Sequence, residues 1–193
     1  MEIQTTIYGK LKNNNHIITI DNDVVIIDAG APAEDFLPYI EGKNVKGILI
    51  THAHYDHIQY LKELLDAFNC KAYMHKNAVP KLKTSDLNLS YFDTPFTLDI
   101  EDEKIETVGE GDKLNLLKDE ITVIELPGHS DCGLGFVINN TLFSGDTLFA
   151  NTYGRTDLPT SSPLQIRNSL KRIFDNYSGF DLYCGHGRPS KVK

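Results

Sequence analysis

The chain has 193 residues, of which 40% are hydrophobic and 24% are charged, a composition typical of a globular protein and not of a disordered one. Its net charge of -8 disfavours nonspecific binding to nucleic acid, and no apolar run approaches the roughly 20 residues that span a bilayer. The sequence therefore predicts a single domain over residues 1–193 that has no nucleic-acid or membrane partner.

The N-terminus and the cysteines favour a cytoplasmic location. Residues 1–4 lack the basic start and the apolar block of a signal peptide. The three cysteines, Cys70, Cys132 and Cys184, cannot all pair within one molecule, and none forms a C-x-x-C motif. Reduced thiols in a reducing compartment fit this pattern best.

The first half of the chain alternates strand-like and helix-like patterns. β-Branched and apolar runs predict strands over residues 3–8, 16–20, 24–27, 47–50 and 71–74, and helical spacing predicts helices over residues 32–39, 58–68 and 76–82. The polar residues 12–15 are expected to form the turn of a hairpin between the first two strands. Leu61 and Leu65, one helical turn apart, should face the core.

The second half is richer in strands. Residues 84–103 show no regular pattern and are interpreted as a long surface loop or a lid. Strands are then predicted over residues 105–108, 121–126, 135–138, 141–143 and 180–184, with a helix over residues 164–174. Strands followed by helices in both halves predict an α+β fold in which two packed sheets carry helices on their outer faces.

The least ordinary segment is residues 51–57, which contains His52, His54, Asp56 and His57 between a predicted strand and a predicted helix. Loops at strand ends can carry chemistry because a rigid scaffold positions them. Alternate side chains of an extended segment share one side, so His52, His54 and Asp56 are expected to converge while His57 faces elsewhere. This arrangement suits two adjacent metal ions better than one.

Three further donors also follow predicted strands: His129, Asp146 and His186. Each has a neighbouring glycine, which would let the backbone turn sharply and approach an ion. Any one of them alone is more often a satisfied histidine or a turn aspartate. Because imidazole nitrogen and carboxylate oxygen are ligands for zinc and iron, the four strand ends taken together predict a metal centre.

The motif His52-x-His54-x-Asp56-His57 with the three later donors resembles that of the metallo-β-lactamase fold superfamily, and within it the glyoxalase II-like hydrolases. The resemblance covers about residues 17–186 and implies a four-layer αββα sandwich with the site at one edge. It implies two divalent metal ions, with zinc favoured and iron or manganese as alternatives. On this basis His52, His54 and His129 would hold the first ion, Asp56, His57 and His186 the second, and Asp146 would bridge them.

Two further segments resemble the same family. Asp28 lies in a D-x-G turn, where it would orient metal-binding histidines through hydrogen bonds. Arg155 and Asp157 lie in a G-R-[ST]-D segment, where an ion pair could support the loop of Asp146; an ordinary surface pair is the alternative. Cys132 and Cys184 are expected to be buried thiols and not ligands, because the seven donors already complete the set.

The resemblance implies hydrolysis of a small-molecule substrate. A water shared by two cations has a lowered pKa and supplies hydroxide near neutral pH. Asp56, both ligand and acceptor, could orient or deprotonate that water and is the expected catalytic residue. A thioester is the favoured substrate, since a thiolate leaves without a strong general acid. The substrate-binding residues and the acyl group are left open.

Alternative functions remain at this stage. A persulfide dioxygenase would keep one iron on His52, His129 and Asp146, and a non-catalytic module would keep metal for structure alone. β-Lactamases are disfavoured because they generally lack the bridging carboxylate. Glyoxalase II enzymes carry a C-terminal helical region that binds glutathione, whereas seven residues follow His186 here, so recognition of glutathione is not predicted. The oligomeric state is left open as well.

Overall fold

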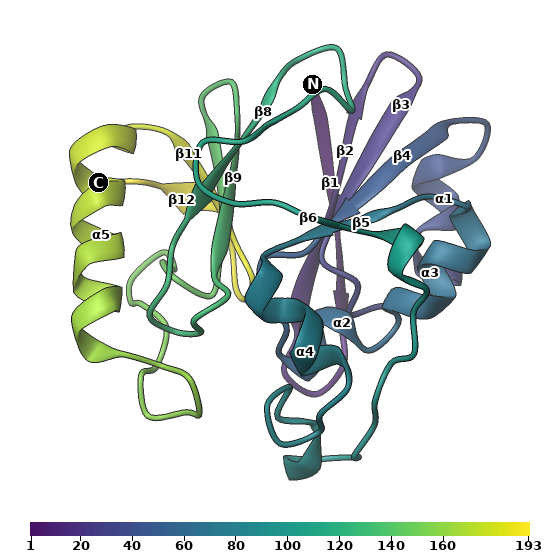
Figure 1. Ribbon diagram of the computed structural model, residues 1–193. Coiled ribbons are helices and arrows are strands. Elements are labelled where there is room, and N and C mark those ends of the chain that lie inside the picture. The colour runs from purple at the N-terminus through teal and green to yellow at the C-terminus, as the bar shows by residue number, and fades with distance from the viewer.

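The computed structural model describes residues 1–193 and contains two six-stranded sheets that pack face to face (Figure 1). The first sheet has the order β1 (Glu2–Tyr8), β2 (Asn13–Ile20), β3 (Asp23–Ile27), β4 (Asn44–Leu49), β5 (Ala72–Met74) and β6 (Ile105–Thr107). The second has the order β12 (Ser190–Lys191), β11 (Asp181–Cys184), β10 (Thr141–Gly145), β9 (Leu134–Ile138), β8 (Ile121–Glu125) and β7 (Lys113–Leu114). Both sheets are mixed, since β3 to β6 run parallel in the first and β10 and β11 run parallel in the second.

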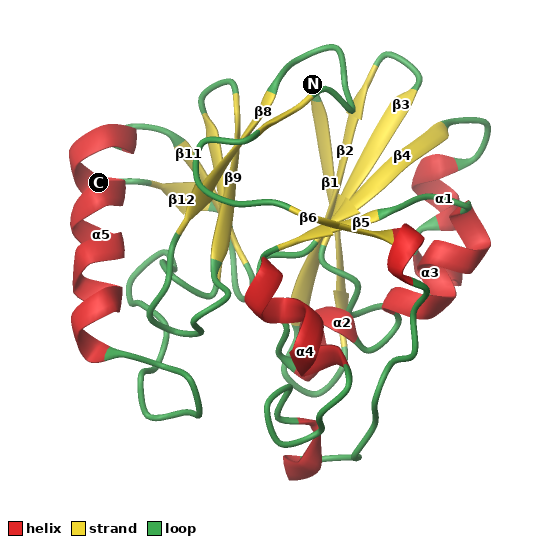
Figure 2. Ribbon diagram, in the orientation of Figure 1, coloured by secondary structure: helices red, strands yellow, loops and turns green.

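Helices cover the outer face of each sheet (Figure 2). The helices α1 (Leu37–Ile40) and α3 (Leu61–Phe68) lie on the first sheet, and α5 (Pro163–Tyr177) lies on the second. The one-turn helices α2 (Tyr55–Ile58) and α4 (Val79–Leu82) follow the parallel strands β4 and β5. None of these helices has the length and apolar character needed to cross a bilayer. The arrangement is the predicted αββα sandwich.

Three hydrophobic clusters fill the three interfaces between these four layers. Strand β3 shows how the sequence builds them, because alternate side chains of a strand point to opposite faces. Val24 and Ile26 belong to the cluster under α1 and α3, whereas Val25 and Ile27 belong to the cluster between the sheets. All four are 0% exposed, which explains why this strand is a continuous apolar run and not an alternating one.

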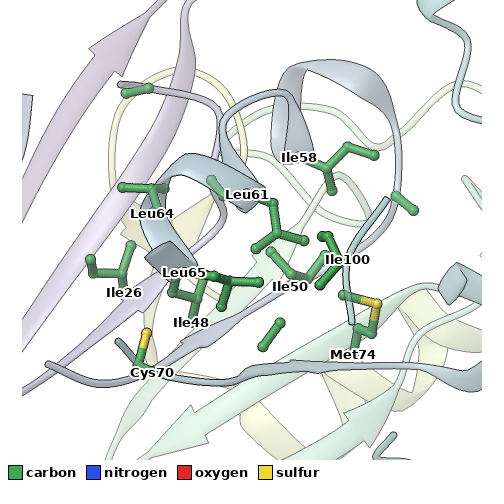
Figure 3. Packing of buried hydrophobic residues seen from close by; sticks show 14 of the residues in the cluster. Ile26, Ile48, Ile50, Ile58, Leu61, Leu64, Leu65, Cys70, Met74 and Ile100 are labelled. Carbon is green, nitrogen blue, oxygen red and sulfur yellow. The ribbon is translucent and has the colours of Figure 1, made fainter. Parts of the chain in front are cut away.

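Helix α3 packs its leucines onto the first sheet (Figure 3). Leu61 and Leu65 are buried as predicted, beside Ile26 and Ile48 of strands β3 and β4. The helix ends at Asn69, whose backbone is left-handed with φ 45°, a conformation that asparagine tolerates better than most residues. The leucines that the helical spacing predicts on one face therefore form the face that packs on the sheet.

The predicted hairpin turn over residues 12–15 is wrong. Asn13, Asn14 and Asn15 belong to β2 and are buried, and the turn lies over residues 9–12. Two of the amides make internal hydrogen bonds: the Asn14 side chain donates to the carbonyls of Cys184 and Gly187 at 2.8 Å, and Asn15 Oδ1 accepts from the backbone N–H of Gly30 at 2.7 Å. A run of asparagines is typical of turns, and only the tertiary contacts override that preference.

Other element boundaries also differ from the predictions. The expected helix over residues 58–68 begins only at Leu61 as α3, and α2 is a separate turn before it; the expected helix over residues 32–39 is a 3-10 turn followed by α1. The two-residue strands β7 and β12 were not predicted, because strands this short carry little sequence signal. Residues 84–103 are irregular apart from short 3-10 turns, as expected, and their role as a lid stays a prediction.

His16 is a buried histidine of β2 that the fold keeps neutral. Its Nε2 donates to the carbonyl of Cys184 at 3.1 Å, so its Nδ1 accepts from the Thr5 hydroxyl at 2.9 Å. Burial lowers the pKa of His16 from 6.5 to about 4. Protonation therefore favours the unfolded chain between these two values.

We expect the free energy of unfolding to fall as the pH drops from 6.5 towards 4, with His16 contributing about 3 kcal/mol of the loss. Below pH 6.5 the unfolded chain binds this proton and the folded one does not. Denaturant unfolding of the metal-free protein and of His16→Gln at pH 7 and pH 4.5 measures the effect. A wild type and a variant with equal pH dependence would contradict it.

Candidate metal centre

Three histidines from two strand ends form the first donor set. His52 and His54 follow β4, and His129 follows β8. The Nε2 atom of His129 lies 2.9 Å from Nδ1 of His54, and the ring centroid of His52 lies 4.5 Å from that of His54 and 5.1 Å from that of His129. One ring nitrogen of each histidine lies within 4.8 Å of those of the others, a spacing that a single ion could span.

The second donor set consists of Asp56, His57 and His186. Asp56 Oδ2 lies 3.5 Å from Nε2 of His57 and 3.3 Å from Nε2 of His186. The expectation from strand alternation that His57 faces elsewhere than Asp56 is wrong. Because α2 begins at Tyr55, Asp56 and His57 lie on a helical turn and not on an extended segment, so strand alternation does not apply to them.

Asp146 lies between the two sets. Its Oδ2 is 3.6 Å from Nε2 of His129 and 3.4 Å from Nε2 of His186, while its Oδ1 is 3.6 Å from Nε2 of His57. One carboxylate therefore faces donors of both sets. Gly185 makes this approach possible, since a Cβ atom there would lie 2.1 Å from Asp146 Oδ1.

Hydrogen bonds from outside the donor sets fix the orientation of three imidazoles. His129 Nδ1 donates to the carbonyl of Arg155, and His186 Nδ1 donates to the carbonyl of Leu11, each at 3.0 Å. A carbonyl can only accept, so Nδ1 carries a proton in both rings and Nε2 is the atom that faces the site. His57 Nδ1 donates to Asp28 Oδ2 at 2.7 Å in the same way.

Asp28 is 1% exposed and joins the two ends of the histidine loop. Besides His57, its carboxylate accepts hydrogen bonds from the backbone N–H and the hydroxyl of Thr51, at 2.8 Å each. The Arg155 and Asp157 side chains form a bidentate ion pair, with two N–O distances of 2.6 Å. The two side chains are 63% and 67% exposed. The contact of Arg155 with the donor set is made by its backbone carbonyl.

Three buried polar atoms that face this region have no hydrogen-bond partner: His52 Nε2, His57 Nε2 and Asp146 Oδ1. Folded proteins satisfy nearly all of their buried polar atoms, so three orphans in one place require an explanation. Divalent cations would satisfy nitrogen and carboxylate oxygen together. The residues present thus fit a metal centre.

The first set is electrostatically prepared to bind a cation. Burial lowers the pKa of His52 and of His54, and the neighbouring imidazoles lower both further. Burial also lowers the pKa of His129. Neutral imidazoles keep the lone pair that a metal ion needs.

The second set carries protons when no cation is bound. Burial opposes protonation of His57, but the carboxylates of Asp56 and Asp28 outweigh it and raise the pKa to about 9. Burial likewise opposes protonation of His186, but hydrogen bonds to Asp146 and Asp56 raise its pKa to about 11. In the metal-free protein these protons balance the buried carboxylates, and bound cations would take over that role.

Comparison with known proteins identifies the family. The model of the metallo-beta-lactamase superfamily matches residues 8–186. The chain belongs to the metallo-β-lactamase superfamily. Across its whole length it is 32% identical to a probable metallo-hydrolase from Streptococcus pyogenes, covering 86% of that protein. Over 90% of its length it is 32% identical to a hydroxyacylglutathione hydrolase from Xylella fastidiosa, and it spans 60% of that relative.

Solved structures agree with this fold. The B3 metallo-β-lactamase BLEG-1 superposes with a TM-score of 0.90 at 28% identity, covering 99% of this chain and 94% of the other. TTHA1623 in a di-iron-bound form superposes with a TM-score of 0.86 at 28% identity, covering 98% and 94%. The family and the sandwich fold predicted from the sequence are confirmed, and membership supports a metal-dependent hydrolase.

A cavity of about 590 Å³ opens beside the two donor sets. Its lining includes three donors and eight further residues, namely His129, Asp146, His186, Phe149, Ala150, Asn151, Thr152, Gly154, Arg155, Gly187 and Arg188. A larger hollow of about 810 Å³ lies over α1 and α3, but no donor lines it. The smaller cavity is therefore the one that can place a substrate against the metal centre.

The remaining histidines and the cysteines lie outside the donor sets. His75 is 7% exposed, and its Nε2 lies 3.3 Å from the Glu125 carboxylate. Cys132 and Cys184 are buried free thiols. The Cys184 thiol donates to the carbonyl of His186 at 3.0 Å, so its sulfur points to backbone and not into either donor set.

Lys81 is a residue of the site region that the sequence did not reveal. It is 2% exposed, and its ammonium group lies 2.8 Å from the Ser130 hydroxyl, 2.7 Å from the Thr160 hydroxyl and 2.6 Å from the Asp131 carboxylate. Ser130 and Asp131 directly follow His129, so Lys81 holds the loop of this donor. A lysine in a short amphipathic helix normally indicates a solvated face.

We expect Lys81→Met to lower the free energy of unfolding by about 1.5–3 kcal/mol, because the polar groups that surround the ammonium lose a charged partner. Lys83→Met is the matched control, since Lys83 is exposed and makes no side-chain hydrogen bond or ion pair; its effect should stay within about 0.5 kcal/mol. Denaturant unfolding of both variants measures the difference. Equal stability of the two variants would contradict this role for Lys81.

Proposed function

We propose that this protein is a dinuclear metal-dependent hydrolase that cleaves thioesters of small molecules. The position of Asp146 carries the proposal, since one oxygen faces His57 while the other faces His129 and His186. A carboxylate between two donor sets can be shared by two cations, in this proposal two zinc ions. The di-iron form of TTHA1623 supports a two-metal site in a chain of similar fold.

The chain's own residues prepare the reaction. Two bound divalent cations would supply a water of lowered pKa and polarise the substrate carbonyl. Burial opposes ionisation of Asp56, but His57 and His186 outweigh it and hold the pKa of this carboxyl below its ordinary value. Asp56 therefore stays ionised at neutral pH and can accept a hydrogen bond from the attacking water, which orients it.

Two observations favour a thioester. The thiolate of a thioester is a stable leaving group, and the cavity offers no carboxyl group outside the donor sets that could act as a general acid. The similarity to a hydroxyacylglutathione hydrolase over 90% of this chain supports the same class of reaction. Because the chain spans 60% of that relative, glutathione itself is not part of the proposal.

β-Lactam hydrolysis is the second candidate, and the similarity to BLEG-1 favours it. A persulfide dioxygenase would need His52, His129 and Asp146 but would leave the second donor set, Asp56, His57 and His186, without a metal-binding role. The convergence of these three residues on one region weighs against it. A module without catalysis would bind metal and hydrolyse nothing.

We expect wild-type protein purified without added metal to contain about two metal ions per chain and to hydrolyse simple thioesters. Asp146→Asn should lose at least one ion, because the neutral amide cannot offset the charge of two cations, and its rate should fall by a factor of about 100 or more. Elemental analysis and a thioester panel with a β-lactam included measure both quantities.

The matched control is Asp66→Asn, which removes an exposed carboxylate of α3 that pairs with Lys62. It should retain metal and activity. One iron per chain together with oxygen uptake would indicate the dioxygenase, and β-lactam turnover without thioester turnover the lactamase. Full thioesterase activity in a metal-free Asp146→Asn protein would exclude the proposed mechanism.

A further inference from the structure

The cavity beside the metal centre has a charge opposite to that of the whole chain. The protein carries a net charge of -8. Outside the donor sets, however, the charged residues that line this cavity are two arginines, Arg155 and Arg188, and no acidic residue joins them. A substrate in the cavity therefore meets cationic and no acidic side chains outside the donor sets.

The two arginines differ in what they have left to bind. The guanidinium of Arg155 is occupied by Asp157, with two hydrogen bonds of 2.6 Å. The Arg188 side chain makes no hydrogen bond or ion pair and is exposed, although its backbone carbonyl accepts from the Cys184 thiol and the carbonyl of the preceding Gly187 accepts from the Asn14 amide. Arg188 lies two residues after the donor His186 and shares the cavity with it. Its five N–H donors are free for a ligand.

The chemistry of guanidinium determines which ligand fits. Its planar fork matches the two oxygens of a carboxylate or the oxygens of a phosphate and pairs with them through charge-assisted hydrogen bonds. Neutral polar residues of the same cavity, Asn151 and Thr152, can supply further hydrogen bonds to such a group. A neutral substrate would leave this charge without a partner.

We propose that Arg188 is a specificity-determining residue that selects substrates carrying a carboxylate close to the scissile bond. The cavity accommodates the half of the substrate that bears this group, while the carbonyl faces the metal centre. This inference rests on the proposed thioesterase function and adds the class of substrate to it. An overall negative surface with a local cationic cavity also directs an anionic substrate to this one place.

The test compares acids with their methyl esters. One pair, S-acetyl-3-mercaptopropionate and its methyl ester, carries the charge on the thiol half. A second pair, the S-ethyl thioester of succinate and its methyl ester, carries it on the acyl half. We expect the metal-loaded wild type to prefer the acid in at least one pair by roughly tenfold in kcat/KM, and Arg188→Met to lose that preference.

Arg167→Met is the control, because Arg167 is exposed on α5 and makes no side-chain hydrogen bond or ion pair. The substitution removes the same charge from the protein as Arg188→Met does. It should keep the preference for the acid. Melting temperatures of both variants verify that they are folded. Equal kcat/KM for acid and ester in both pairs of the wild type, or a preference that survives in Arg188→Met, would overturn the proposal.

A binding experiment separates this inference from the thioesterase proposal. The unreactive thioether 3-(methylthio)propanoate and its methyl ester are titrated into the same metal-loaded proteins by calorimetry. Tighter binding of the acid to the wild type than to Arg188→Met supports the anion site even if no thioester is hydrolysed. Equal binding of the acid to both proteins would overturn it even if thioesters are hydrolysed.

Discussion

The packing of the two sheets against each other is the constraint on which the metal centre depends. The residues Ile27, Leu49 and Phe143 lie in the cluster between the sheets and are 0% exposed. Each stands just before a loop of the site, leading to Asp28, the histidine loop and Asp146 respectively. Burying a large apolar side chain contributes about 1.5–3 kcal/mol, so the contacts that stabilise the sandwich also fix where the donors lie.

Charge balance is the second constraint. Asp28, Asp56 and Asp146 bring three carboxylates into one largely buried region, which is costly unless each is paired. Protons on His57 and His186 provide that pairing when no cation is bound, because the carboxylates raise the pKa of both imidazoles. Cations that replace these protons bind the folded chain selectively, and metal should therefore also stabilise the fold.

Much of the centre could be predicted because its signals are local. Strand β3 is an apolar run buried on both faces, β4 ends in the buried residues Gly47, Ile48 and Leu49, and each donor loop follows a strand in the sequence. The resemblance to the family motif then predicted the seven donor residues, and the structure brings all seven to one region. The assignment of each donor to a particular ion stays a prediction.

What the sequence could not predict depends on distant contacts. Asn14 forms part of a strand because its amide meets the carbonyls of Cys184 and Gly187, far along the chain. Lys81 is buried because two hydroxyls and a carboxylate from later loops surround its ammonium group. His57 joins the donors because one helical turn forms inside the loop. None of these contacts leaves a periodic trace in the sequence.

The most direct test of the two-cation centre is X-ray diffraction from crystals of the wild type grown with zinc, with data collected on both sides of the zinc absorption edge. We expect two anomalous peaks, one among His52, His54 and His129 and the other among Asp56, His57 and His186, with Asp146 in contact with both. A single peak, or zinc bound away from these residues, would contradict this expectation.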